Sequence, residues 1–89
     1  MKQLRIQVYG KVQGVYFRAS TRLKAIELSL KGYVENKQDG SVYIEAEGTE
    51  ENLSIFLDWC KNGPPEADVR EIHRSEGPLC HYLNFIIRT

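Results

Sequence analysis

The chain has 89 residues, 42% of them hydrophobic, and its twelve Lys and Arg balance twelve Asp and Glu to give a formal net charge of zero. This length fits one globular domain without room for a second core, so we expect a single domain over residues 1–89. A net charge of zero excludes a global basic field that would concentrate nucleic acid or an anionic membrane around the protein. We therefore expect neither of these partners, and only local anion sites.

The N-terminal residues, MKQLRIQVYG, indicate a strand rather than a targeting segment. Their polar and apolar side chains alternate, whereas a signal peptide has an unbroken apolar core. No run in the sequence approaches the length of a membrane span, and we expect a cytoplasmic protein that is a monomer. Cys60 and Cys80 lack a disulfide-framework or metal-type spacing, so we interpret both as reduced thiols, with a pairing between them left open.

The predicted elements begin with a strand and a helix. Leu4, Ile6 and Val8 alternate with polar residues, which predicts a strand with one face on the core. After a loop that contains glycine, apolar residues recur at the helical period and predict a helix from about residue 17 or 18 to residue 28. The residues expected on its buried face are Ala19, Leu23, Ile26 and Leu30.

A β-hairpin is predicted next. Tyr33 and Val34 indicate a short strand, and the Asp39–Gly40 pair favours a tight reversal because glycine tolerates positive φ. In the strand that follows, alternation places one set of side chains on the core and the other on an open face. The expected core set is Val42, Ile44 and Ala46, and the expected open set is Tyr43, Glu45 and Glu47.

A second helix is predicted after this hairpin. Thr49 can cap its N-terminus, with two glutamates in the first turn, where the helix dipole favours negative charge. The Gly-Pro-Pro run at residues 63–65 ends the helix, because glycine supplies a left-handed cap and proline cannot continue the hydrogen-bond ladder. The apolar stripe expected to face the core is Leu53, Phe56, Leu57 and Cys60.

Two further strands complete the predicted fold. One covers about residues 69–74, and the last covers residues 83–88, with Leu83, Phe85 and Ile87 pointing the same way. The order strand, helix, strand, strand, helix, strand, plus a short terminal strand, is that of a ferredoxin-like split βαβ sandwich. We therefore expect an α+β fold in which an antiparallel sheet carries both helices on one face.

The loop from Gly10 to Arg18, GKVQGVYFR, is the candidate site. A loop that enters a helix N-terminus presents unpaired backbone N–H groups and the positive end of the helix dipole, which together favour an anion. Gly14 lets the backbone curl around a ligand, and Arg18 adds a planar set of donors suited to phosphate oxygens. From these residues alone, a plain turn followed by a solvated arginine is an equal alternative.

Two motifs carry a resemblance to a known family. GKVQGVYFR resembles the first signature of the acylphosphatase family, in which a glycine, Val-Gln-Gly-Val, a variable residue and Phe-Arg follow the first strand. GYVENKQDGSVYIEAEG, from Gly32 to Gly48, resembles the second signature, with its aromatic residue, valine, asparagine and Asp-Gly-Ser-Val hairpin. The resemblance continues through GPPEADV to the C-terminal residues 85–88 and so covers nearly the whole chain.

The resemblance implies an acylphosphatase, which hydrolyses the carboxyl-phosphate bond of acyl phosphates without a metal ion or cofactor. It implies that Arg18, with the backbone of the loop at residues 11–18, binds the phosphoryl group, and that Asn36 positions the attacking water. Arg18 and Asn36 are thus the candidate catalytic residues. The candidate phosphate-binding residues are Gln13, Gly14, Val15, Tyr16, Phe17 and Arg18.

Other interpretations stay open. A regulatory domain that binds an anion without hydrolysing it would keep Arg18 and have no use for Asn36, which could then simply cap the hairpin. An RNA-binding domain on the same fold would stack bases on sheet aromatics, and KGYVENK faintly resembles such a strand. His73 and His81 lack metal-ligand spacing, so we assign them no site.

The chain departs from the family pattern at two positions. Ser29 stands where many members have glycine, and a left-handed serine there would cost about 1 to 2 kcal/mol. Tyr33 replaces a frequent tryptophan and keeps an aromatic side chain. Neither departure affects the roles that the resemblance implies for Arg18 and Asn36.

Overall fold

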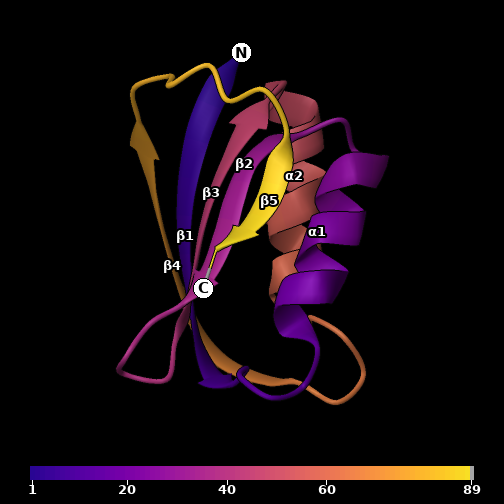
Figure 1. The fold of residues 1–89 in the computed structure, drawn as a ribbon, viewed down its shortest axis with the longest axis vertical. Helices are drawn as coiled ribbons and strands as arrows, with labels where there is room; N and C mark the ends of the chain where they lie inside the picture. Colours follow the sequence, from indigo (N-terminus) through magenta and orange to yellow (C-terminus); the bar gives the residue numbers. More distant parts are fainter. Residues whose placement is uncertain (89) are drawn as a thin grey trace.

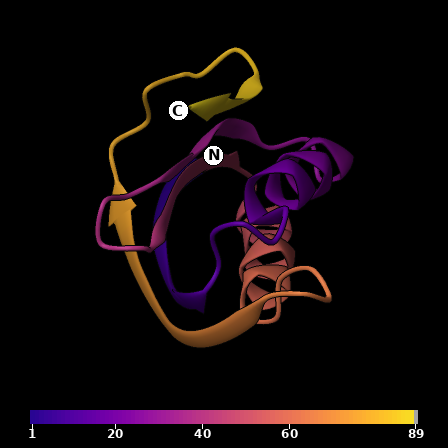
Figure 2. The ribbon, with the colours of Figure 1, turned by 60° about the horizontal axis from the view of Figure 1, so that its bottom comes forward.

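The computed structural model of the chain describes residues 1–88, and Thr89, the last residue of the domain expected over residues 1–89, lies outside the described part. The helices and strands follow in the predicted order (Figure 1). They are β1 (Lys2–Lys11), α1 (Phe17–Glu27), β2 (Lys31–Asn36), β3 (Val42–Gly48), α2 (Glu50–Cys60), β4 (Asp68–Gly77) and β5 (Phe85–Arg88). Both helices lie on the same side of the curved sheet (Figure 2), which confirms the α+β ferredoxin-like architecture. Neither of the helices described is long and apolar enough to cross a membrane.

The sheet is mixed rather than antiparallel throughout. Its strand order is β4-β1-β3-β2-β5, and the first four strands pair antiparallel as predicted. β5 instead pairs parallel with β2, with Phe85 opposite Gly32 and Ile87 opposite Val34. The reason is the segment at residues 78–84, drawn in yellow in Figure 1, which crosses one end of the sheet from β4 before the chain turns back alongside β2.

The core lies between the sheet and the helices, and the predicted alternation of β1 and β3 is confirmed. The side chains expected on the core face of these two strands are buried, as is the apolar stripe of α2. Thr49 caps α2 as predicted, since its Oγ1 accepts a hydrogen bond from the Asn52 N–H at 3.2 Å. Cys60 lies in this core and Cys80 is exposed, and both are free thiols.

The buried face predicted for α1 is wrong. Leu23 is 66% exposed and Ile26 is 49% exposed, and Ala19 is exposed as well. Leu30 is buried, but it lies beyond the end of the helix. The face that packs on the sheet holds Phe17, Thr21 and Ala25. Phe17 sets this rotation, because its ring packs against Trp59 of α2 with 5.8 Å between ring centroids, which turns the opposite side of α1 toward solvent.

The side chains predicted to share one face of the last strand are not together on the core. Leu83 precedes β5 and is 91% exposed, and of the three residues only Phe85 is buried. Phe85 reaches the core next to Phe56 of α2, with 6.3 Å between ring centroids. The short strand therefore has one core side chain, and the others remain available at its surface.

The face of β3 predicted to be open is instead partly covered. Glu45 and Glu47 are buried, because the segment at residues 78–84 passes over them. Glu45 accepts hydrogen bonds from three tyrosine hydroxyls, those of Tyr33 at 3.2 Å, Tyr43 at 2.6 Å and Tyr82 at 2.6 Å. Glu47 accepts bonds from the side chain of Gln3 and the backbone N–H groups of Cys80 and Tyr82. These carboxylates hold the crossing segment against the sheet.

Acid should therefore weaken the fold through these two carboxylates. Burial alone would raise the pKa of Glu45, but the three tyrosine hydroxyls hold this pKa below its ordinary value of 4.5. Burial opposes the hydrogen bonds at Glu47 in the same way, and its pKa is also lowered. A carboxylate whose pKa is lowered in the folded state stabilises the fold fully above its ordinary pKa. This stability is lost as the pH falls below the ordinary pKa and through the lowered pKa of the folded state.

We expect urea titrations between about pH 7 and pH 3 to show the free energy of unfolding falling below about pH 4.5. Glu45→Gln should lower stability near neutral pH, where it removes the charged acceptor, and should flatten the fall in acid. A parent protein whose stability stays constant down to pH 3 would contradict this assignment.

Ser29 ends α1 in a strained conformation. Its φ is 57°, in the left-handed region that favours glycine, and the Leu30 N–H donates back to the Ala25 carbonyl at 2.8 Å. Ser29→Gly should stabilise the protein by about 1 kcal/mol, measured by urea or thermal unfolding. The control is Ser20→Gly inside the helix, which should destabilise by about 0.5 kcal/mol. Equal losses in both variants would contradict the strain at Ser29.

Candidate active site

The site lies at the end of the molecule where β1 leads into α1. Val42 of β3 pairs with Val8 of β1 on one side and with Asn36 of β2 on the other, both antiparallel. β1 and β2 therefore run parallel and finish at the same edge of the sheet. The start of α1 and the end of β5 lie at this edge too (Figure 1). The topology thus brings Asn36 beside the loop that contains Arg18.

The loop before α1 has two left-handed residues. Gly14 has a φ of 76°, and the space where a Cβ would stand is open. Tyr16, the residue that precedes the helix, has a φ of 62° and a ψ of 23°. A tyrosine in this region carries strain of order 1–3 kcal/mol, which persists only where the surrounding structure imposes it and is frequent at functional sites. The backbone is thus curled by both residues toward the helix N-terminus.

The N-terminus of α1 offers its backbone donors. No side chain within the described residues caps it, and its first turn holds no acidic residue. The first bond of the helix runs from the Ser20 N–H to the Tyr16 carbonyl at 3.0 Å, so the N–H groups of residues 17–19 precede the hydrogen-bond ladder. Uncapped donors at the positive end of a helix form a favourable position for an anion.

A cleft of about 400 Å³ opens over this N-terminus. Its lining residues come from the loop, α1, β2 and β5: Val12, Gly14, Tyr16, Phe17, Arg18, Ala19, Asn36 and Ile87. Arg18 is the one charged side chain among the described residues that line it. The cleft therefore presents a single positive charge together with the donors of the helix.

Asn36 contributes an acceptor that nothing in the described structure uses. Its Oδ1 is buried and has no hydrogen-bond partner among residues 1–88. The hairpin turn is held by other groups, since Asp39 Oδ1 accepts bonds from the Ser41 N–H at 2.9 Å and from its hydroxyl at 2.6 Å. A buried acceptor without a partner costs about 1–3 kcal/mol unless a ligand or water satisfies it.

Two of the residues predicted to bind phosphate have their side chains elsewhere. Gln13 Nε2 donates to the backbone carbonyls of Lys37 at 2.8 Å and Ser41 at 2.9 Å, so this side chain ties the loop to the β2–β3 turn. Val15 is buried in the core. Any contact of these two residues with a phosphate has to come from the backbone, whereas Gly14, Tyr16, Phe17 and Arg18 line the cleft.

Packing beneath the loop fixes its position. Phe17 is buried, and besides Trp59 it meets the turn after α2. A Cβ on Gly63 would come within 2.5 Å of the Phe17 ring, so only glycine allows this close approach. Ala19 and Ile87 line the cleft but were not predicted from the sequence, and Val12 was predicted only as part of the loop at residues 11–18. Val12 lies inside the loop motif and Ala19 directly follows it, but Ile87 reaches the cleft only because β5 pairs with β2.

Titratable side chains elsewhere form no comparable site. Within residues 1–88 no group of three or more His, Cys, Asp or Glu side chains is placed to hold a metal ion. His73 contacts the Glu71 carboxylate on the exposed part of β4. This contact explains the position of the His73 side chain, and no ligand is needed to explain it.

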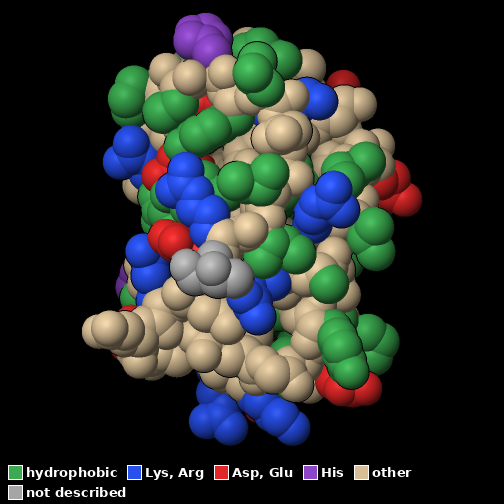
Figure 3. Space-filling view, viewed as in Figure 1, with side chains coloured by type: hydrophobic (Ala, Val, Ile, Leu, Met, Phe, Trp, Pro, Cys, Tyr) green, Lys and Arg blue, Asp and Glu red, His purple; other side chains and the backbone are tan. Residues whose placement is uncertain are grey.

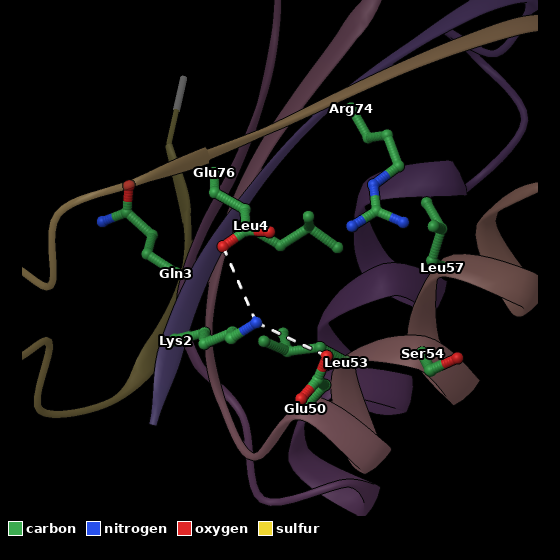
Figure 4. Close-up of a pocket in the computed structure, with 9 residues that line it drawn as sticks. All are labelled: Lys2, Gln3, Leu4, Glu50, Leu53, Ser54, Leu57, Arg74 and Glu76. Atoms are coloured by element: carbon green, nitrogen blue, oxygen red, sulfur yellow. Dashed lines mark hydrogen bonds and ion pairs between the residues drawn. The ribbon is translucent and has the colours of Figure 1, made fainter.

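A second cleft, of about 130 Å³, lies between α2 and the strands β1 and β4 (Figure 4). Its Lys2 reaches toward two carboxylates, Glu50 at 3.4 Å and Glu76 at 3.8 Å, and its floor is lined by leucines. Pockets that hold small molecules usually measure about 300–1,000 Å³. We assign this smaller cleft no function, because none of the predicted site residues lines it.

Comparison with known proteins identifies the family. A family model described as acylphosphatase matches residues 4–87. The chain belongs to the acylphosphatase family. The acylphosphatase of Thermotoga maritima is 48% identical over 88 residues, which covers 99% of this chain and 98% of the relative. That of Archaeoglobus fulgidus is 48% identical over 85 residues and 96% of each chain. The crystal structure of acylphosphatase from Bacillus subtilis has a TM-score of 0.97 and 41% identity, with 100% of both chains covered.

The resemblance drawn from the two motifs is thus confirmed, and with it the expected activity. This acylphosphatase is a hydrolase that acts on small acyl phosphates. Its cleft is lined by Arg18, by the start of a helix with free N–H groups, and by Asn36, whose buried amide oxygen has no partner among the described residues. Such a set can bind a phosphoryl group and align a water molecule.

Proposed function

We propose that this acylphosphatase binds the phosphoryl group of its substrate with Arg18 and the backbone N–H groups of the loop at residues 11–18, and that Asn36 positions the attacking water. The observation that carries this proposal is the buried, unpartnered Oδ1 of Asn36, a residue that lines the same cleft as Arg18 and the uncapped N-terminus of α1.

Phosphoryl binding is supported by charge and by geometry. Arg18 is the charged side chain of the cleft, and its planar set of donors suits phosphate oxygens. The N–H groups at the start of α1 precede the hydrogen-bond ladder and lie at the positive end of the helix dipole, where an anion is favoured. As charge redistributes over the phosphoryl oxygens in the transition state, these fixed donors stabilise it without reorganising.

The role proposed for Asn36 follows from the donor and acceptor pattern of water. The Oδ1 atom accepts a hydrogen bond from the water and leaves a lone pair of the water oxygen to face the phosphorus. The new bond forms between this oxygen and phosphorus, while the bond from phosphorus to the acyl oxygen breaks. Holding the water in place converts an encounter in solution into a reaction within one complex, which is worth several kcal/mol.

The leaving group explains why so few residues suffice. It is a carboxylate whose conjugate acid has a pKa near ~4, so it departs without being protonated at neutral pH. Ester phosphates release an alkoxide, for which a general acid is usually required. In this proposal the proton of the water passes to a phosphoryl oxygen of the substrate, and no metal ion or cofactor takes part.

The structure also bears on the two competing functions. A regulatory module would have no use for the buried acceptor of Asn36. An RNA-binding sheet needs exposed aromatic rings, but Tyr33 is 7% exposed and lies beneath Arg88, whose Cζ is 3.7 Å from the ring centroid. On the face shown in Figure 3, basic side chains are interspersed with acidic and hydrophobic ones. These features favour hydrolysis over either alternative.

We extend the proposal to the state of the protein in the cell. The balanced charge and the burial of Tyr33 support a protein without a nucleic-acid partner. The single core supports one domain over the whole chain, and we propose that it works as a monomer in the cytoplasm. Light scattering at two protein concentrations would test the monomer, since a mass that rises with concentration contradicts it.

The test of the reaction is hydrolysis of benzoyl phosphate by the purified chain in EDTA, with p-nitrophenyl phosphate as a parallel ester substrate. We expect rapid cleavage of the acyl phosphate that resists the chelator and little cleavage of the ester. Activity that disappears in EDTA and returns with a divalent cation would overturn the metal-free mechanism. Binding of inorganic phosphate without cleavage of either substrate would favour the regulatory module.

A further inference from the structure

The cleft is larger than the phosphoryl group alone requires. Its volume of about 400 Å³ lies within the range of roughly 300–1,000 Å³ of pockets that hold whole small molecules. The donors gather at one side, where α1 begins, and Asn36 lies at the end of β2. The remaining lining is the part that an acyl group can contact.

We propose that Tyr16 and Ile87, with the small side chain of Ala19 in the first turn of α1, form a subsite for the acyl group. The subsite selects acyl phosphates whose acyl group is aromatic or aliphatic and uncharged. This inference rests on the proposed phosphoryl site, because it assumes that the phosphorus is held at Arg18. It adds the class of the acyl group, about which the two sequence motifs say nothing.

The exposure of Tyr16 is the first observation behind this proposal. Its side chain lines the cleft but is 75% exposed, so the ring does not serve the core. Its left-handed backbone also carries strain that a glycine would avoid. An aromatic ring held at the mouth of the cleft can pack against a flat or apolar acyl group as the substrate binds.

The position of Ile87 is the second observation behind this proposal. This residue lies on β5 next to Ile86, and the two isoleucines have nearly the same exposure, 39% and 41%. Neighbouring residues in a strand point to opposite faces of the sheet, and only Ile87 lines the cleft. The terminal strand thus places one apolar side chain at the site and an equivalent one on the other face, where it cannot contact the substrate.

The charge of the lining supplies the selectivity against anionic acyl groups. With the phosphoryl group on Arg18, no second cation remains among the described lining residues. A carboxylate or second phosphate on the acyl chain would therefore lose water on entering the cleft without gaining an ion pair. The described lining residues include no acid either, so a basic acyl group also finds no partner among them.

The experiment compares kcat/KM for benzoyl phosphate with that for acetyl phosphate, which share the reacting bond and differ in the acyl group. We expect Ile87→Ala to lower the benzoyl-to-acetyl ratio by about fivefold to tenfold, while Ile86→Ala leaves it within about twofold of the parent. Tyr16→Asn should lower the ratio similarly, because asparagine accepts the left-handed backbone but lacks the ring, whereas Tyr16→Phe should keep it.

A second comparison tests the charge. Succinyl phosphate carries a free carboxylate, and butyryl phosphate has an acyl chain of the same length without one. We expect kcat/KM for succinyl phosphate to be lower by about tenfold or more. Equal values for the two substrates would overturn the proposed selectivity.

Equal ratios in Ile87→Ala and Ile86→Ala, together with equal ratios in Tyr16→Asn and Tyr16→Phe, would overturn the subsite itself. The failure of the proposed function has a different signature, in which the parent cleaves neither substrate. The subsite is then tested by the affinities of benzoylphosphonate and acetylphosphonate, inert analogues with a phosphorus–carbon bond. Tighter binding of the benzoyl analogue, lost in Ile87→Ala but not in Ile86→Ala, supports it, and equal binding of both analogues contradicts it.

Discussion

Arg18→Gln should lower kcat/KM for benzoyl phosphate by about a thousandfold or more and should abolish competitive inhibition by inorganic phosphate. The guanidinium is the single charge among the described residues that line the cleft, so its removal leaves a neutral site for a substrate that carries negative charge in both the ground state and the transition state. Glutamine is a good helix former, and the variant should fold like the parent.

The control for this variant removes a positive charge from the same helix outside the cleft. Lys24 pairs with Glu27 at 2.6 Å and does not line the site. Lys24→Gln should retain kcat/KM within about twofold, since the effect of a surface charge outside the cleft is largely screened by salt. Parent-like inhibition by phosphate in Arg18→Gln would mean that the backbone donors of the loop bind the phosphoryl group without the guanidinium.

Asn36→Ala should separate binding from turnover. We expect kcat to fall by about a hundredfold to a thousandfold, because the water loses its positioning acceptor, while inhibition by inorganic phosphate stays within about threefold of the parent. Stability should not fall, since Oδ1 makes no hydrogen bond within residues 1–88 and its removal deletes an unsatisfied buried acceptor.

Asn52→Ala is the matched control and should show the opposite pattern. Asn52 Nδ2 donates to the Leu28 carbonyl at 3.1 Å, so its amide ties α2 to the end of α1 and has no place in the cleft. Its replacement should cost about 1 kcal/mol of stability and leave kcat near the parent value. An Asn36→Ala enzyme that hydrolyses substrate as fast as the parent would show that another group aligns the water.

The elements, and the position of Arg18 and Asn36 in one cleft, were predictable because their signals are local. Period-two alternation predicted β1 and β3, and the capping threonine and the Gly-Pro-Pro run predicted the limits of α2. Arg18 and Asn36 each lie within a continuous motif, and antiparallel pairing of both β1 and β2 with β3 is sufficient to bring them to one edge.

The features that depend on distant contacts were missed. The rotation of α1 follows from the packing of Phe17 on Trp59, and no local pattern distinguishes this rotation from one that buries Leu23. The parallel pairing of β5 likewise depends on the crossing segment, so Ile87 could not be assigned to the cleft from its own neighbours. Burial of Glu45 has the same origin, because Tyr82 of that segment covers it.

The position of β1 in the sheet has a consequence for how fast the protein folds. β1 begins the chain, yet its partners are β3 and β4, with Lys2 opposite Gly48 and Gln3 opposite Gly77. Long loops must close before these pairs can form and compensate for the lost chain entropy. We therefore expect refolding in milliseconds to seconds rather than microseconds. During synthesis, β1 has no partner until β3 has left the ribosome and stays half-paired until β4 follows. The nascent chain therefore carries an unpaired strand edge until β4 has emerged.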